Sequence, residues 1–192
     1  MPFFYPLLPE FAFIRSFILF AESFIDAMET FKSLNITLCE LVNSIDAVIC
    51  FTKPSSEKWS IAEIVEHLNI SDKGAYLAML KPGPIPTEAE INESKLRIAS
   101  MLGGAAGAWI APEAAQPTGK YTNTAALLQD FMKVRNRLER QFETGDPAQL
   151  ALGLEHPKLG FLTQQQWLEF LIWHTEHHLQ QIRGIMQHSE TL

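Results

Sequence analysis

The sequence predicts an all-α protein, an antiparallel four-helix bundle with an extra apolar segment at its N-terminus. Apolar residues recur at alternating spacings of three and four over long stretches, which is the period of one face of a helix. Proline, glycine and helix-capping residues separate these stretches. No long stretch alternates apolar and polar residues as a half-buried strand does, and no internal repeat is present. Together these observations predict helices packed on helices.

Length and composition indicate one globular domain, alone or with one extension. A chain of 192 residues, 47% of them apolar, can bury a substantial core without disulfides or metal staples. The formal net charge of -7 argues against a general nucleic-acid binder, because that affinity comes mainly from clustered lysine and arginine. The one dense basic group alternates with acidic residues and is interpreted as a solvated helix face; it comprises Lys133, Arg135, Arg137 and Arg140.

Residues 1–21 form an apolar extension that we expect to be partly helical, ahead of a bundle that spans residues 22–192. The extension lacks a basic start, and Pro9, Glu10 and Arg15 interrupt the apolar run that a signal peptide or membrane span needs. The expected location is therefore the cytoplasm, with no membrane partner. Exposed phenylalanines would be a liability on a monomer, so we expect a homodimer that buries Phe3, Phe4, Phe11, Phe13 and Phe17.

The first helical pattern begins at Pro9, a residue well suited to a first helical turn, and a second amphipathic run continues to about Cys50. One straight helix over this whole length would be about 60 Å long, too long for a compact domain of this size. We therefore expect a break between residues 20 and 35. Cys39 and Cys50 would then share one face of the second helix, as buried thiols in a reducing compartment.

Ser60 and Glu63 mark the start of the next helix, because they have the spacing of a capping box. This helix should run to about Leu80, where a proline-rich turn stops it. Residues 87–121 are the least regular part of the sequence, with a short helix expected over residues 91–102 and a glycine-rich loop after it. A connection this long in a compact domain is often a binding loop or a lid.

The third long helix should begin at a cap formed by Thr122 or Thr124 and end near Glu143. After a turn, Thr163 and Gln166 have the spacing of another capping box, which opens the last helix. The inward-facing residues expected for the third helix are Leu127, Leu128, Phe131, Val134 and Leu138.

The last helix carries two histidines inside its apolar stripe. His174 and His178 are four residues apart, so they stand about one turn, roughly 6 Å, above each other and could bind one cation. Buried imidazoles without partners are costly, so this pair needs hydrogen bonds or a metal ion. His67, near the edge of the apolar stripe on the helix after Ser60, could complete a site between facing helices. Three neutral imidazoles with an open position suit Zn²⁺ or Ni²⁺.

Spacing alone leaves other roles open for these residues. The two histidines of the last helix could instead be exposed or hydrogen-bonded, and His67 could be an ordinary boundary residue. Gln181 follows His178 by one turn on the same face, where it could orient a histidine, bind a ligand or simply fill polar space. His177 points to a different side of the helix.

Two familiar histidine motifs are absent. Ferritin-like di-iron bundles use Glu-x-x-His pairs, and no histidine of this sequence has glutamate three positions before it. Zinc peptidases use His-Glu-x-x-His, but Thr175 takes the position of that glutamate. Glu176 projects away from the two histidines, toward solvent, so it is a poor candidate for a general base.

Three stretches resemble the DinB-like superfamily, which includes the bacillithiol transferases and the mycothiol-dependent maleylpyruvate isomerases. They are residues 59–68, WSIAEIVEHL, residues 156–163, HPKLGFLT, and residues 167–182, WLEFLIWHTEHHLQQI. The resemblance covers about residues 22–188. A tryptophan-led helix with a histidine eight residues on, followed later by His-x-x-x-His, is fairly specific for the superfamily but not for one activity within it.

The resemblance implies a four-helix bundle in which His67, His174 and His178 hold a divalent metal ion. It also implies that the ion binds a low-molecular-weight thiol or water and makes it a nucleophile at neutral pH. The leading expectation is therefore an enzyme that transfers a thiol to a small electrophile or hydrolyses it, in a pocket lined by the last helix and residues 81–121. The alternative is a non-catalytic metal-binding or stress-response module without turnover. The sequence leaves the substrate, the reaction and the physiological metal open.

Overall fold

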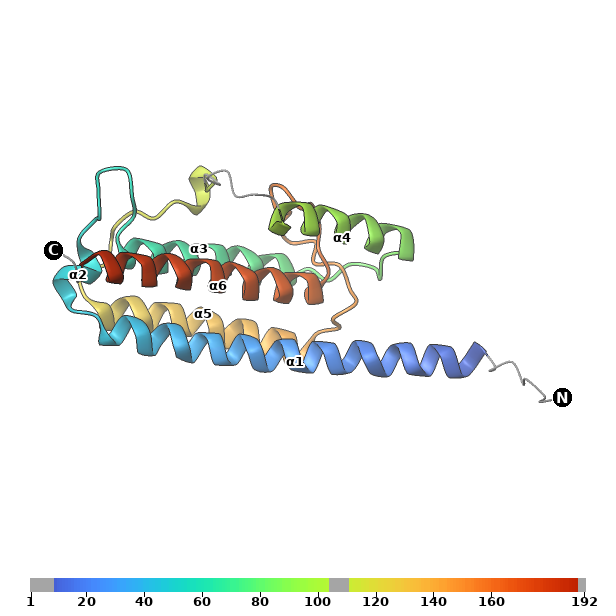
Figure 1. Cartoon of the computed structure of the whole chain (residues 1–192). Coiled ribbons are helices and arrows are strands. Elements are labelled where there is room, and N and C mark those ends of the chain that lie inside the picture. Colours follow the sequence, from blue (N-terminus) through green and yellow to red (C-terminus); the bar gives the residue numbers. More distant parts are fainter. Residues whose placement is uncertain (1–8, 104–110, 190–192) are drawn as a thin grey trace.

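Four long helices lie side by side and form the body of the molecule (Figure 1). They are α1 (Pro9–Ser44), α3 (Ile61–Met79), α5 (Thr124–Thr144) and α6 (Gln164–Ser189). The short elements are α2 (Ala47–Phe51), α4 (Glu88–Gly103) and the 3-10 helix η1 (Glu113–Ala115). The computed structural model describes residues 9–103 and 111–189, with the side chains of residues 23–101 and 111–187. The described residues contain no β-strand, and the predicted all-α four-helix bundle is confirmed.

The bundle consists of two pairs of helices that run in opposite directions. α1 and α6 run one way, and α3 and α5 run the other way (Figure 1). α3 packs against α5 and α1 packs against α6, so the antiparallel arrangement holds between the pairs and not within them. A parallel neighbour requires the chain to return along the bundle before the next helix begins. This requirement explains the long connection between α3 and α5, residues 80–123, which contains α4 and η1.

α1 is one continuous helix, so the break expected between residues 20 and 35 is wrong. The expectation assumed that each helix must fit within the length of the domain. Instead, the N-terminal part of α1 extends past the end of the bundle (Figure 1). The length of a helix is therefore not limited here by the size of the core that it packs against.

Several expectations concern segments that the structure does not describe in full. The phenylalanines that predict a homodimer lie within residues 1–22, whose side chains fall outside the described part, so the homodimer and the domain boundary at residue 21 stay predictions. Most of the glycine-rich loop, residues 104–110, also lies outside it. In the part of the chain that is described, no helix is both long and apolar enough to cross a membrane.

α2 follows α1 after a turn. The Asp46 side chain accepts a hydrogen bond from the backbone N–H of Val48 at 2.8 Å, which starts the new helix. Cys39 therefore lies on α1 and Cys50 on α2, and the expectation that they share one helix is wrong. Both are free thiols, and burial raises the pKa of both. Neither thiol is activated as a nucleophile by its surroundings.

Both predicted capping boxes are confirmed. Glu63 N–H donates to Ser60 Oγ at 3.2 Å, and Ser60 N–H donates to Glu63 Oε2 at 2.8 Å. Gln166 N–H donates to Thr163 Oγ1 at 3.2 Å, and Thr163 N–H donates to Gln166 Oε1 at 3.0 Å. The ends of α3 and α6 that carry these boxes are thus fixed by residues that the sequence identified.

The other two helix starts differ from expectation. α5 is capped by Asn123, whose Oδ1 accepts from Ala126 N–H at 2.8 Å, and not by Thr122 or Thr124. Thr124 is already the first helical residue, so its side chain cannot serve as the cap. α4 begins earlier than residue 91, at Glu88. The inward-facing residues expected for α5 are all buried.

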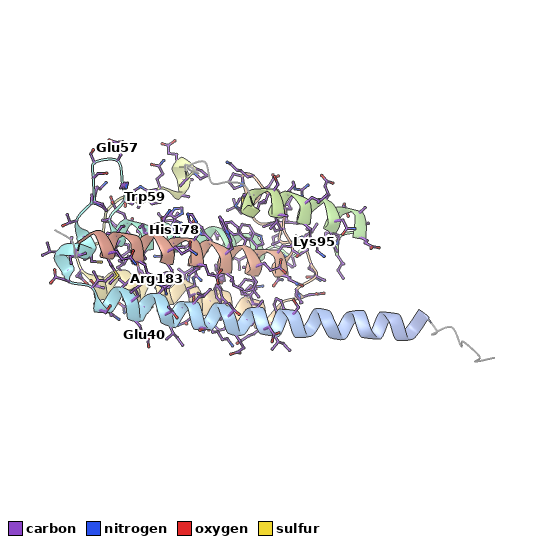
Figure 2. The ribbon with its side chains drawn as sticks, viewed as in Figure 1. Glu40, Glu57, Trp59, Lys95, His178 and Arg183 are labelled. Carbon is purple, nitrogen blue, oxygen red and sulfur yellow. The ribbon has the colours of Figure 1, made fainter. Side chains whose placement is uncertain are left out.

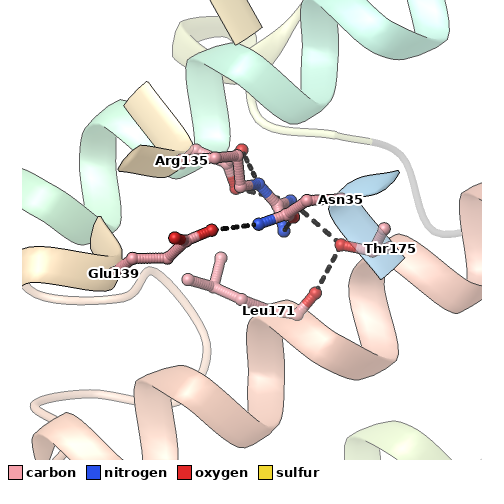
Figure 3. Close-up of polar contacts among 6 residues, drawn as sticks. Asn35, Arg135, Glu139, Leu171 and Thr175 are labelled. Carbon is pink, nitrogen blue, oxygen red and sulfur yellow. Dashed lines mark hydrogen bonds and ion pairs between the residues drawn. The ribbon is translucent and has the colours of Figure 1, made fainter. Parts of the chain in front are cut away.

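Arg135 is fully buried, so its interpretation as part of a solvated face is wrong. Its guanidinium donates to both carboxylate oxygens of Asp72, at 2.6 and 3.0 Å. It also donates to Asn35 Oδ1 and Thr175 Oγ1, so one side chain joins all four long helices (Figure 3). The basic residues around Arg135 alternate with acidic residues, which is the pattern of a surface helix. The sequence therefore did not indicate that Arg135 is buried.

The turn before α6 is built on His156. Its Nδ1 accepts hydrogen bonds from the backbone N–H groups of Lys158 and Leu159, at 3.2 and 3.0 Å. Gly160 has a φ of 74°, a left-handed conformation that glycine adopts without strain. Burial and the charge of Lys158 lower the pKa of His156 to about 4. The imidazole is therefore neutral at pH 7, and its lone pair holds the turn.

Acidification should destabilise the protein through His156. The folded-state pKa of about 4 lies below the ordinary value of 6.5, so between these pH values only the unfolded chain takes up the proton. The free energy of unfolding should therefore fall as the pH is lowered from 6.5 toward 4, by up to about 1.4 kcal/mol per pH unit from this residue. Urea denaturation of the metal-free protein across this pH range measures the slope.

A His156→Asn variant provides the control. Asparagine can still accept hydrogen bonds from backbone N–H groups a few residues ahead, but it does not titrate. The wild type should lose more stability than the variant over the same pH range, and the difference removes the contribution of the other histidines. Parallel curves for the two proteins would show that His156 is not responsible.

Candidate metal centre

The structure brings His67 of α3 together with His174 and His178 of α6, the three residues that the sequence singled out. One ring nitrogen of each lies within 4.8 Å of the others, and all three side chains are buried. His174 Nε2 is central, at 3.1 Å from His67 Nε2 and 3.0 Å from His178 Nε2. Nitrogen ligands on a tetrahedral ion, at about 2.1 Å from it, are about 3.4 Å apart. The observed spacing is close to that of a metal centre.

The opposite ring nitrogens determine which nitrogens carry protons. His67 Nδ1 lies 2.6 Å from the carbonyl oxygen of Ala115, which can only accept, so this Nδ1 carries the proton. His178 Nδ1 lies 2.8 Å from Gln181 Oε1, and the amide nitrogen of Gln181 donates to His177 Nε2 at 3.0 Å. The amide orientation that satisfies both contacts makes His178 Nδ1 a donor as well.

The consequence is that lone pairs point at one another in the centre of the group. With their protons on Nδ1, His67 and His178 both direct an Nε2 lone pair toward His174 Nε2. A proton on His174 Nε2 could satisfy only one of them well, and it would leave His174 Nδ1 as an unpaired acceptor. Among the described residues His174 Nδ1 has no hydrogen-bond partner in any case. One cation would satisfy all three Nε2 lone pairs at once, so the donor set fits a metal ion.

Burial keeps the three imidazoles neutral. Burial is the main cause of a lowered pKa at each of them. It lowers the pKa of His67, that of His178 to about 3, and that of His174 well below its usual range. For His174, the neighbouring histidines and the Arg135 guanidinium lower the pKa further. Neutral imidazole is the form that binds metal, so the ion does not have to compete with the second proton of an imidazolium at neutral pH.

Aromatic rings surround the histidine group. Trp59 packs on His67 with ring centroids 4.9 Å apart, and Phe170 stacks on His174 at 5.3 Å. Trp173 stacks on His177 at 5.4 Å. Figure 2 shows Trp59 and His178 in the same region of the bundle, toward the end that carries α2. Trp59 and Phe170 thus pack directly on rings of the group, and Trp173 packs on the neighbouring His177.

Two groups accept hydrogen bonds from the histidines of the site, and the sequence indicated only one of them. Gln181 was recognised as a candidate because it lies one turn from His178, and the structure pairs the two side chains. The Ala115 carbonyl was missed, because every residue has a carbonyl and no residue type marks one that accepts from a histidine. Glu176, the poor candidate for a general base, is exposed.

The sequence matches the family model of the DinB superfamily over residues 37–182, most of the chain, and all three histidines lie within that range. The chain is also similar to the uncharacterized protein YuaE of Bacillus subtilis (strain 168). The two are 28% identical over 141 residues, which cover 72% of this chain and 83% of YuaE.

Among solved structures, the chain is similar to YfiT from Bacillus subtilis, with a TM-score of 0.59 and 16% sequence identity. The match covers 88% of this chain and 89% of YfiT. YfiT is described as a probable metal-dependent hydrolase with an unusual four-helix bundle topology. At this level of identity the likeness shows a shared fold.

Proposed function

The chain belongs to the DinB superfamily, and from that premise we propose that His67, His174 and His178 bind one divalent metal ion, Zn²⁺ or Ni²⁺, in an enzyme that acts on small molecules. The observation that carries the proposal is the convergence of three Nε2 atoms in a buried group whose lone pairs no arrangement of protons satisfies well. A site with three protein nitrogens leaves a position for an exogenous ligand, as catalytic zinc sites do.

When bound, the ion would lower the pKa of a coordinated thiol or water, so that either becomes a nucleophile near pH 7. The chain's own groups would hold the ligand rings in place. The Ala115 carbonyl fixes His67, and Gln181 fixes His178, each by accepting from Nδ1. Phe170 and Trp59 cover two of the rings and keep water away from them.

Two reactions agree with this centre. Transfer of a low-molecular-weight thiol to an electrophile is what the resemblance to the thiol transferases implies. Hydrolysis is supported by the description of YfiT as a probable metal-dependent hydrolase, and an ester or amide is the substrate class that we propose for it. Both use the same three histidines and the same open position, so the substrate decides between them.

A non-catalytic metal-binding module, acting for example in a stress response, is the second candidate. The observation that favours it is the absence of a carboxylate from the histidine group, as far as the chain is described. An enzyme of this kind often has an acidic residue to move protons. A thiol nucleophile needs such an acidic residue less than a water nucleophile does, because a thiol is a stronger acid than water even before it binds the metal.

Metal analysis of freshly purified protein tests the proposal. We expect about one divalent ion per chain, which a chelator removes and added Zn²⁺ or Ni²⁺ restores. Turnover of a thiol with an electrophilic substrate, or of an ester or amide, should disappear and return with the metal. A protein that binds the metal but turns over none of these substrates would favour the non-catalytic module. A protein that binds no divalent ion would contradict both.

A further inference from the structure

The last part of the connection between α3 and α5, residues 111–121, reaches the histidine group, where Ala115 O accepts from His67. This segment is called the strap below. The strap contacts α3 at three points, and each contact involves a different side chain of that helix. Ala115 O accepts from His67, Thr118 and Gly119 donate to Glu66, and the Tyr121 hydroxyl accepts from Asn69.

After the contact of Ala115 with His67, the next strap residues along the chain that bond to α3 are Thr118 and Gly119, and both bond to Glu66. Thr118 Oγ1 donates to Glu66 Oε1 at 2.7 Å, and Gly119 N–H donates to Glu66 Oε2 at 2.9 Å. The side chain is only 2% exposed, and a carboxylate that is buried to this degree is costly unless both oxygens are paired. Gly119 has a φ of 69°, the left-handed conformation, at the residue whose N–H meets the carboxylate.

The part of the strap before this contact is held by its own hydrogen bonds. Ala115 N–H donates to Pro112 O at 2.8 Å, and Gln116 N–H donates to Glu113 O at 3.1 Å. The Gln116 side chain also donates to Ala111 O at 3.3 Å. These hydrogen bonds hold residues 111–116 together. The anchoring of Thr118 and Gly119 by Glu66 therefore also limits where the Ala115 carbonyl can lie.

We propose that Glu66 is a positioning residue for the metal centre. It holds the strap so that the Ala115 carbonyl accepts from His67 Nδ1, which leaves the His67 Nε2 lone pair directed at the ion. Glu66 is not one of the three proposed ligands, and it acts through the strap. The inference rests on the proposed function for its consequence on metal binding, but the tautomer of His67 can be observed without metal.

Three variants and two measurements test this role. Glu66→Ala removes both acceptors, whereas Glu66→Gln can keep both contacts, since its amide oxygen can accept from Gly119 and its amide nitrogen can donate to Thr118 Oγ1. Tyr121→Phe is the matched control, because it loosens the same strap beyond the Glu66 contact. Chelator competition gives the affinity for Zn²⁺, and long-range ¹H–¹⁵N correlation spectra give the His67 tautomer in the metal-free protein.

Glu66→Ala should bind Zn²⁺ about ten- to a hundredfold more weakly than the wild type, and its His67 should no longer be a single Nδ1–H tautomer. Glu66→Gln and Tyr121→Phe should stay within about threefold of the wild type and keep one tautomer. If Glu66→Ala does not fold, Thr118→Val, which removes one donor only, should show the same change in smaller degree.

The inference is overturned if the alanine variant, or the valine variant in its place, keeps both the wild-type affinity and a single His67 tautomer. It is also overturned if Tyr121→Phe weakens Zn²⁺ binding as much as Glu66→Ala does, because the strap would then act only through general stability. A wild type that binds no metal would contradict the proposed function, and the tautomer measurement would still decide the role of Glu66.

Discussion

Replacement of His174 by alanine is expected to lower the affinity for Zn²⁺ or Ni²⁺ by roughly a hundred- to a thousandfold. His174 Nε2 lies between the other two Nε2 atoms, so its loss leaves His67 and His178 without the nitrogen that both approach. A structural zinc site with four ligands binds with about 10–16 kcal/mol, or about 2.5–4 kcal/mol per ligand, and each 1.4 kcal/mol is a factor of ten. Chelator competition and metal analysis measure the loss.

Leu168→Ala is the matched control for this experiment. It creates a cavity on the same helix, at a fully buried position six residues before His174. It should lower the free energy of unfolding by about 2–5 kcal/mol, yet the variant should still bind metal. The wild type should also become more heat-stable when metal is added, and His174→Ala should not. Retention of a tightly bound ion by His174→Ala would exclude the proposed ligand set.

Replacement of Arg135 by methionine is expected to lower the free energy of unfolding by about 3–5 kcal/mol, because it leaves the buried Asp72 carboxylate without its partner. The guanidinium is fully buried, makes both contacts to that carboxylate, and lies between the rings of Phe31 and Phe131. Methionine retains much of the packing volume, so the loss reports mainly on charge and hydrogen bonds. Urea or guanidinium denaturation at pH 7 measures it.

The pH dependence of the Arg135→Met variant offers a second readout. Burial raises the pKa of Asp72, and Arg135 opposes this effect in the wild type. Without Arg135 the folded-state pKa should rise further above the unfolded value, so the folded variant takes up a proton as the pH falls. The difference in stability between wild type and variant should therefore narrow from pH 7 toward pH 5.

A double variant separates the loss of the ion pair from damage to packing. Asp72→Val combined with Arg135→Met removes both charges and should be more stable than Arg135→Met alone, since no unpaired charge remains buried. An equally unstable double variant would show that Arg135 stabilises the core through its shape and not through Asp72.

Much of the fold followed from local patterns. The apolar periodicity predicted the long helices, and the Ser60–Glu63 and Thr163–Gln166 boxes predicted where two of them begin. These signals work because helix period and capping depend on residues only a few positions apart. The extent of α1 did not follow in the same way, because nothing local tells whether a helix ends with the core or continues past it.

The candidate site was predictable in part for the same reason. The four-residue spacing put His174 and His178 on one face of the helix. The position of His67 near the edge of an apolar stripe made it a candidate for the third ligand, and the family resemblance supported that choice. The Glu66 contact with the strap was not predictable, because Thr118 and Gly119 reach Glu66 from 52 and 53 residues away in sequence. Arg135 was assigned to the surface, because charged residues lie close to it in sequence, whereas the Asp72 carboxylate that pairs with it in the core lies 63 residues away.

The sequence by itself determined the helical class, two of the helix starts, and which histidines share a helix face. The tertiary structure alone decided that α3 lies beside α6, so that His67 meets the other two, and that Arg135 joins four helices in the core. The physical reason is that hydrophobic burial, which brings the helices together, is not directional. The hydrogen bonds of buried polar groups such as Arg135 and Asp72 are directional, and they are satisfied only where the four helices meet in this arrangement.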